Sequence, residues 1–144
     1  MILVIITCVI FLDQLTKFLA SKFLHLNTSV SLINNFLYLT LVHNRGAAFG
    51  MFKNRLLIFV LISIFAIVLI FFYLRNKKSS FLSRLALGLI LSGAVGNLID
   101  RLRFGFVIDF IDFRVWPVFN LADSAVTIAA LLLTWELCFK KNAT

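Results

Sequence analysis

Four long apolar segments dominate the sequence and restrict the environment in which it can fold. The most restrictive is LLIFVLISIFAIVLIFFYL, residues 56–74, which contains no charged side chain. A helix needs about 20 mostly apolar residues to cross the hydrocarbon core of a bilayer. The pattern predicts an α-helical integral membrane protein with four transmembrane helices. The expected spans cover residues 1–22, 56–74, 81–101 and 118–139.

The composition also indicates a membrane domain and excludes an ordinary soluble one. Hydrophobic residues make up 62% of the 144 residues and charged residues only 14%, whereas soluble domains carry about 25% charged residues. Four spans leave room for one domain, residues 1–144. The first apolar run lacks the basic leader of a cleaved signal peptide, and Asp13 and Lys17 interrupt it. We therefore interpret it as a retained span.

The net charge of +8 comes from basic residues that are scattered or lie at the ends of spans. No basic stripe with interleaved aromatic residues occurs, so we expect no nucleic acid partner. Such residues usually anchor loops to the phospholipid headgroups of the membrane. Cytoplasmic loops carry an excess of Lys and Arg, but the count on the two sides is nearly equal here. The basic residues on the side opposite residues 75–80 and 140–144 share that side with acidic residues. We therefore assign residues 75–80 and 140–144, and hence both termini, to the cytoplasm.

Two further segments are rich in β-branched and aromatic residues and do not have the character of a span. Residues 28–42 and 104–116 each predict a short strand. Strand edges cannot lie bare in hydrocarbon. The two segments should therefore pair with each other or lie at the membrane surface against the helices. The fold that we expect is four helices with a small extracytoplasmic β-sheet or cradle.

The polar side chains of the spans gather toward one leaflet. Successive spans alternate in direction, so the ends of odd-numbered spans and the starts of even-numbered spans lie on the same side. Asp13 and Lys17 are spaced for an i,i+4 ion pair. Ionisable residues inside a membrane are functional candidates, although contacts between helices would explain several of them equally well. The polar residues on the shared side include Asp13, Lys17, Asn44, Asn97, Asp100, Arg101, Asn120 and Asp123.

Asp109 and Asp123 differ from the other acids because neither has a basic neighbour in the sequence. Asp109 lies in a strand-like segment, Asp123 lies near the start of the last span, and the chain turns back between them at Trp116-Pro117. This topology can bring the two carboxylates together. Two carboxylates in a low-dielectric site share one proton, and such a pair can deprotonate a water while it protonates a carbonyl oxygen, as in aspartic proteases. A two-aspartate pattern alone is weak evidence for a protease.

The histidines and cysteines do not predict a metal site. His25 and His43 lack the spacing of metal ligands, and Cys8 and Cys138 each lie in an apolar run outside any Cys/His cluster. We interpret both cysteines as small packing residues.

Four ordered blocks of the sequence resemble the signature blocks of bacterial lipoprotein signal peptidase, also called signal peptidase II. They are DQLTK (13–17), NRGAAFG (44–50), GNLIDRLRFGFVIDF (96–110) and FNLADS (119–124). The resemblance covers essentially the whole chain, and the key positions match the family pattern.

The resemblance implies an intramembrane aspartic endopeptidase of the bacterial cytoplasmic (inner) membrane, with its active site toward the outer leaflet. Its substrate would be a prolipoprotein that carries a diacylglyceryl cysteine, cut just before that cysteine without a cofactor or a metal. Asp109 and Asp123 match the catalytic dyad, and which of them starts protonated stays open. We expect a monomer. The matching support and substrate-binding positions are Asn97, Asp100, Arg101, Asn120, Asn44, Arg45, Gly46, Asp13, Lys17 and Ala122.

The residue types suggest roles for some of these positions. Asn97 and Asn120 could orient the dyad or the scissile peptide by hydrogen bonds. Arg45 or Arg101 could hold the ester oxygens or headgroup of a lipid, although Arg101 could instead pair with Asp100.

The main alternative is a small four-span proton-coupled transporter, in which intramembrane acids carry protons. A transporter needs a path that opens to each side in turn, whereas the polar groups here gather at one end and Glu136 is the acid of the other half. A structural assembly subunit would explain the hydrophobicity but not the convergence of four polar blocks.

Overall fold

The structure is a computed structural model that describes residues 2–46, 56–75 and 80–139. The described chain contains four helices that are long and apolar enough to cross a membrane, and three strands. In chain order the elements are α1 (Ile2–Phe23), β1 (Ser29–Ile33), β2 (Leu37–Asn44), α2 (Leu56–Arg75), α3 (Phe81–Phe104), β3 (Val107–Asp112) and α4 (Leu121–Phe139).

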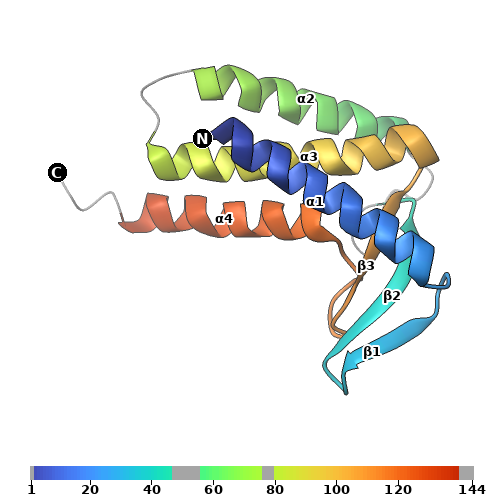
Figure 1. Ribbon diagram of the computed structural model, residues 1–144. Coiled ribbons are helices and arrows are strands. Elements are labelled where there is room, and N and C mark those ends of the chain that lie inside the picture. The colour runs from blue at the N-terminus through green and yellow to red at the C-terminus, as the bar shows by residue number, and fades with distance from the viewer. Residues whose placement is uncertain (1, 47–55, 76–79, 140–144) are drawn as a thin grey trace.

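The helices run side by side, and the sheet extends from one end of the bundle (Figure 1). Helix α3 is central, because it packs against each of the other three helices. The start of α1 and the end of α4 lie at the end of the bundle away from the sheet. The chain between α3 and α4 passes through β3, so the sheet is tied directly to the two helices that contact each other most. The expected fold of four spans with a small sheet is therefore confirmed.

The sheet is antiparallel, with the strand order β1-β2-β3. The segment expected as one strand over residues 28–42 is a hairpin, because a turn with Asn35 at φ 60° divides it. The expected pairing of the two strand segments is confirmed, since Val42 of β2 lies opposite Asp109 of β3. One face of the sheet packs on α1, where Ala20 joins Leu41 and other apolar sheet residues in a small core. The sheet thereby fixes Asp109 relative to α1.

Two helix ends differ by three residues from the expected spans, and local contacts explain both. Helix α3 continues to Phe104 and ends at Gly105, which adopts φ 77° and donates its N–H to the Arg101 carbonyl. A left-handed glycine is the usual way to end a helix. Helix α4 begins only at Leu121, because Phe119 still exchanges backbone hydrogen bonds with Ile111 of β3. The start of α4 is therefore anchored to the sheet.

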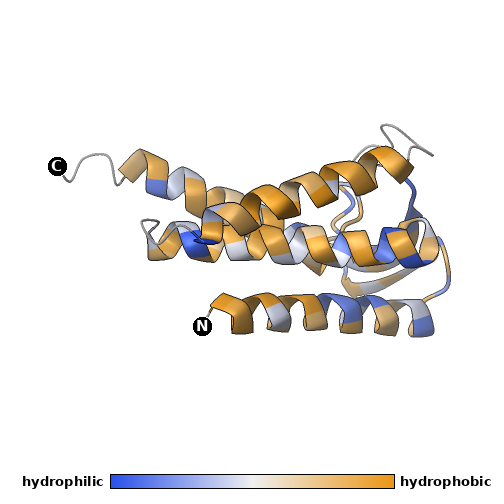
Figure 2. Cartoon of the chain, turned by 90° about the horizontal axis from the view of Figure 1, so that it is seen from above, coloured by the Kyte–Doolittle hydropathy of each residue, from blue (hydrophilic) through white to orange (hydrophobic). Residues whose placement is uncertain are grey.

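Large apolar side chains cover the outer surface of the helices. In Figure 2 the helices are orange over most of their length, and hydrophilic residues gather more densely at the end that carries the sheet. In α2 only Ile70 is buried among 20 residues. Such a surface would be unstable in water but matches the hydrocarbon of a bilayer. The chain is a multi-pass membrane protein.

Close approach of α3 to α4 depends on Gly93. A methyl group added to this residue would lie 2.5 Å from the carbonyl oxygen of Ala122 and 2.6 Å from Cγ2 of Val126. Small residues allow membrane helices to pack backbone against backbone. This contact holds the first turn of α4, which carries Asp123, against α3.

We expect Gly93→Ala to lower the free energy of unfolding by about 1–3 kcal/mol, because α3 and α4 must separate to admit the methyl group. Gly88→Ala is the matched control, since its methyl group would meet only the Ile2 and Ile6 side chains, at 3.3 Å or more. Unfolding of purified protein by titration with a denaturing detergent measures both variants. Equal stability of the two variants would contradict the close packing of α3 on α4.

Candidate active site

A buried lysine joins two helices at the end of the bundle nearest the sheet. The ammonium of Lys17 in α1 lies 2.9 Å from a carboxylate oxygen of Asp13 and 2.9 Å from one of Asp100 in α3. The three residues are at most 1% exposed. Buried charges persist only when they are paired and hydrogen-bonded. The expected i,i+4 pair is present, and Asp100 adds a second partner across the bundle.

The two carboxylates of this cluster also hold the backbone next to the predicted dyad. Asp13 Oδ1 accepts a hydrogen bond from the N–H of Ala122 at 2.9 Å, and Asp100 Oδ2 accepts one from the N–H of Ile108 at 3.1 Å. Ala122 and Ile108 directly precede Asp123 and Asp109. The Lys17 cluster therefore connects the backbone of α4 with that of β3.

Asp123 lies in the first turn of α4 and forms reciprocal hydrogen bonds with Asn120. The Asn120 side-chain oxygen accepts the N–H of Asp123 at 2.9 Å, and Asp123 Oδ2 accepts the N–H of Asn120 at 3.4 Å. This arrangement is a capping box, which satisfies N–H groups that a helix start leaves free. The other oxygen, Oδ1, accepts the amide of Asn97 at 2.8 Å. Both carboxylate oxygens of Asp123 are thus oriented.

Asp109 lies on β3 and is 1% exposed. Its two oxygens accept amide hydrogen bonds from Asn120 at 2.6 Å and from Asn44 at 2.9 Å. Burial, and then the negative charge of Asp123, raise the pKa of Asp109 to about 7. A carboxyl with such a pKa can hold or release a proton near neutral pH, which acid–base catalysis requires.

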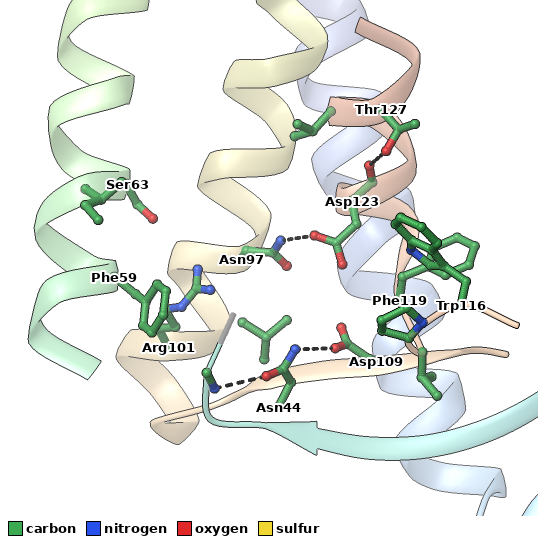
Figure 3. Close-up of a pocket in the computed structure, with 16 residues that line it drawn as sticks. Asn44, Phe59, Ser63, Asn97, Arg101, Asp109, Trp116, Phe119, Asp123 and Thr127 are labelled. Atoms are coloured by element: carbon green, nitrogen blue, oxygen red, sulfur yellow. Dashed lines mark hydrogen bonds between the residues drawn. The ribbon is translucent and has the colours of Figure 1, made fainter. Parts of the chain in front are cut away.

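Both aspartates line one cavity of about 440 Å³ between α2, α3, α4 and the sheet (Figure 3). The two carboxylates point toward the same space in the close-up. The rest of the wall combines polar and apolar side chains. The lining residues outside the dyad include Asn44, Gly46, Phe59, Ile62, Ser63, Asn97, Arg101, Val107, Trp116, Pro117, Phe119, Val126 and Thr127.

The other predicted site residues divide into groups. Asn44, Gly46, Asn97 and Arg101 line the cavity. Asn120 is fully buried and bridges the dyad. A second group stands behind the cavity and supports its backbone: Asp13, Lys17, Asp100 and Ala122.

The two candidate arginines occupy different environments. Arg101 lines the cavity with its guanidinium 5.2 Å from the centre of the Phe59 ring, whereas the salt bridge of Asp100 is made with Lys17. Arg45 is exposed, and the cavity lining does not include it. Residues 47–50 of the NRGAAFG block lie outside the described residues.

Sequence reasoning missed several residues of the site. Gln14 donates to Asp100 at 3.0 Å and to the Gly96 carbonyl at 3.2 Å, which completes the Lys17 cluster. Gln14 directly follows Asp13 in the sequence, and this position could have indicated that it belongs to the cluster. Phe59 and Ser63 bring α2 into the cavity wall. Ser63 is a rare polar residue in this helix and could have been singled out, but nothing in a uniformly apolar sequence marks the face that carries Phe59.

The described residues contain no group of three or more His, Cys, Asp or Glu side chains that could hold a metal ion. The chemistry available from the cavity itself is acid–base chemistry by two carboxyls. Their amide neighbours orient them, and the surrounding apolar wall strengthens electrostatic interactions. A water between the carboxyls could be deprotonated by one while the other donates to an electrophile.

The chain is similar to known proteins over almost its whole length. The family model described as "Signal peptidase (SPase) II" matches residues 5–139. A lipoprotein signal peptidase of Caldanaerobacter subterraneus subsp. tengcongensis is 48% identical over 97% of each chain, and one of Halothermothrix orenii is 45% identical over 92% of each chain. A solved bacterial membrane enzyme at 30% identity superposes with a TM-score of 0.92, covering 98% of this chain and 89% of the other. A second one superposes at 0.85 with 32% identity, covering 94% and 91%.

We expect Lys17→Met to lower the free energy of unfolding by about 3–5 kcal/mol, because it leaves two buried carboxylates without a cation. The triple variant Asp13→Asn, Lys17→Met, Asp100→Asn should recover part of this loss, since it removes the uncompensated charges. Unfolding in detergent at neutral pH measures both. If Lys17→Met alone is as stable as the unmodified chain, the ion cluster does not support the bundle.

Proposed function

The chain belongs to the signal peptidase II family and is a membrane peptidase, and from this we propose that Asp109 and Asp123 form its catalytic dyad. The proposed substrate is a prolipoprotein with a diacylglyceryl cysteine, which the enzyme cuts just before that cysteine. The observation that carries the proposal is the shared cavity: two carboxyls, one with a pKa near 7, open into the same space at one end of a lipid-exposed bundle.

The proposed reaction uses one ionised and one protonated aspartate. The ionised carboxylate takes a proton from a water, and the water oxygen bonds to the scissile carbonyl carbon. The protonated carboxyl gives its proton to the carbonyl oxygen, so a gem-diol forms. The leaving nitrogen then receives the proton taken from water, the carbon–nitrogen bond breaks, and one hydroxyl of the gem-diol returns its proton to the dyad. Neither a metal nor a redox partner is needed for the balance.

The cavity walls suit a lipidated peptide that enters from the bilayer. Phe59 and Ile62 of α2 and Val126 of α4 form apolar surface beside the dyad, and acyl chains can lie against such surface without loss of polar contacts. Arg101 is the cation among the described lining residues, and its guanidinium can donate hydrogen bonds to the ester oxygens or to a headgroup. These positions lead us to assign lipid binding to the α2 side and peptide hydrolysis to the α4 and β3 side.

We further propose that both termini face the cytoplasm and that the sheet and the cavity lie toward the outer leaflet of the cytoplasmic membrane. The start of α1 and the end of α4 share one end of the bundle, opposite the sheet. A substrate whose signal peptide has crossed the membrane presents its lipidated cysteine at that outer face. We expect the enzyme to act as a monomer, because a single chain supplies both aspartates and the amides that hold them.

The transporter alternative is less well supported by the position of the polar groups. In the described chain, the ionisable side chains of the helices that are buried as whole residues are Asp13, Lys17 and Asp100, and they gather at the end nearest the sheet. At the other end Glu136 accepts hydrogen bonds from the hydroxyls of Ser80 and Ser83, which ties the end of α4 to the start of α3. A carboxylate used in this way is a helix connection rather than a step on a proton path.

We expect Asp109→Asn and Asp123→Asn each to reduce cleavage by about 10²–10⁴-fold, because either change removes a proton-transfer group. Cleavage of a diacylglyceryl prolipoprotein by purified protein, followed by gel shift, measures the loss. Asp112→Asn is the matched control: Asp112 lies on the same strand, binds Thr40, and does not line the cavity. Near-normal turnover by either dyad variant would exclude the aspartic mechanism at that position.

The orientation can be tested by thiol labelling in a background without Cys8 and Cys138, using a maleimide that cannot cross membranes. We expect Val115→Cys, at a site 92% exposed beside the sheet, to react in cells whose outer surface is accessible. Phe139→Cys, at the opposite end of the bundle, should react only after the membrane is opened. The reverse pattern would place the sheet in the cytoplasm.

A further inference from the structure

The two aspartates of the cavity have unequal surroundings, and the inequality bears on their roles. The inference below rests on the proposed function, in which one aspartate must be ionised and the other protonated. The sequence leaves open which is which. The hydrogen bonds and charges around each carboxyl provide a basis for the assignment.

Two successive hydrogen bonds connect Lys17 of α1 with Asp123. The ammonium of Lys17 donates a hydrogen bond to the side-chain oxygen of Asn97 at 2.9 Å, and the amide nitrogen of Asn97 donates to Asp123 Oδ1 at 2.8 Å. A cation on the oxygen of an amide polarises its N–H bonds, so the amide becomes a better donor to an anion. Asn97 therefore transmits part of the Lys17 charge to Asp123.

Two further positive contributions favour an anion at Asp123. The residue lies in the first turn of α4, where the free N–H groups of a helix stabilise negative charge. The guanidinium of Arg101 also lines the cavity into which Asp123 points, where a cation favours a negative charge. The hydrogen bonds from Lys17 through Asn97, the helix start and the guanidinium together stabilise the ionised form of Asp123.

The surroundings of Asp109 are neutral by comparison. Among the described residues, its hydrogen-bond donors are the uncharged amides of Asn44 and Asn120. The side chain is almost fully buried on β3 rather than at a helix start. Burial, then the charge of Asp123, raise its pKa to about 7, so a proton on Asp109 costs little near neutral pH.

We propose that Asp123 is the resting carboxylate and general base, that Asp109 is the resting acid, and that Lys17 acting through Asn97 is the positioning residue that sets this order. A proton from the attacking water moves to Asp123, and the proton of Asp109 moves to the scissile carbonyl oxygen. When the gem-diol collapses, Asp123 gives its proton to the leaving nitrogen and a hydroxyl of the gem-diol reprotonates Asp109. The dyad then returns to its starting state.

The other charged groups around the dyad are compatible with this order. Lys17 also influences Asp109, but less directly, because the donor contacts of Asp109 come from Asn44 and Asn120. Asp13, which accepts a hydrogen bond from the N–H of the residue before Asp123, is itself paired with Lys17. Within residues 2–46, 56–75 and 80–139, the charged groups that face the dyad are Asp13 and Lys17 of α1 and Asp100 and Arg101 of α3.

Two amide variants test the assignment through the pH dependence of kcat/KM. Asn97→Ala removes a donor that stabilises ionised Asp123, so the base is formed only at higher pH, and we expect the acid limb to move up by about one pH unit. Asn44→Ala removes a donor that stabilises ionised Asp109, so Asp109 keeps its proton to higher pH. We therefore expect the alkaline limb to move up by a similar amount.

The opposite assignment exchanges these results: Asn44→Ala would move the acid limb and Asn97→Ala the alkaline limb. Because the limbs belong to the coupled pair, the limb that moves further in each variant decides. Unfolding curves show whether both variants are folded. If Asn97→Ala does not fold, the pH profile of Asn44→Ala alone decides between the two assignments. A profile unchanged in both would overturn the assignment. Failure of the dyad itself is distinguishable, since Asp109→Asn or Asp123→Asn would then keep activity.

Discussion

The contact between Lys17, Asp13 and Asp100 is the interaction on which the rest of the site depends. Buried ion clusters of this kind seldom add net stability, because removing charges from solvent costs several kcal/mol per ion. They instead fix the positions of the groups around them, because each buried carboxylate must keep its hydrogen-bond and ion-pair partners. Here Asp13 and Asp100 each use an oxygen to hold the backbone N–H that precedes a dyad residue. One ammonium thus sets the position of Asp123 relative to Asp109, although the two lie on a helix and a strand.

The membrane explains why the site has this construction. Lipid-facing helices gain little from hydrophobic contact with one another, so small residues and internal polar contacts hold them together. Gly93 allows α3 to meet α4, and the Lys17 cluster joins α1 to both. The sheet adds what helices alone do not supply, which is a rigid strand that carries Asp109 into the space beside the first turn of α4. The same polar contacts that assemble the bundle therefore also orient Asp109 and Asp123.

Much of this arrangement could be predicted from residue patterns, because apolar length and alternating direction are strong constraints. They predict four spans and the convergence of Asp13, Asn97 and Asp123 at one end, as observed. Contacts that depend on helix rotation were not predictable. The spacing of Asp13 and Lys17 indicates their pair, but nothing local shows that Asp100 faces Lys17 while the next residue, Arg101, faces the cavity. The hairpin of β1 and β2 was not predicted, because the apolar residues on both sides of its turn form the pattern of a single strand.

The most direct test of the catalytic assignment is a structure of the Asp123→Asn variant with an uncut diacylglyceryl prolipoprotein peptide. We expect the scissile carbonyl carbon to lie between residue 123 and the Asp109 carboxyl, with the carbonyl oxygen within hydrogen-bond distance of Asp109 and the acyl chains against Phe59 and Ile62. A scissile bond bound elsewhere would contradict the assignment of Asp109 and Asp123 as the catalytic pair. One such place is the apolar groove between α1 and the sheet that Phe23, Leu39 and Phe110 line.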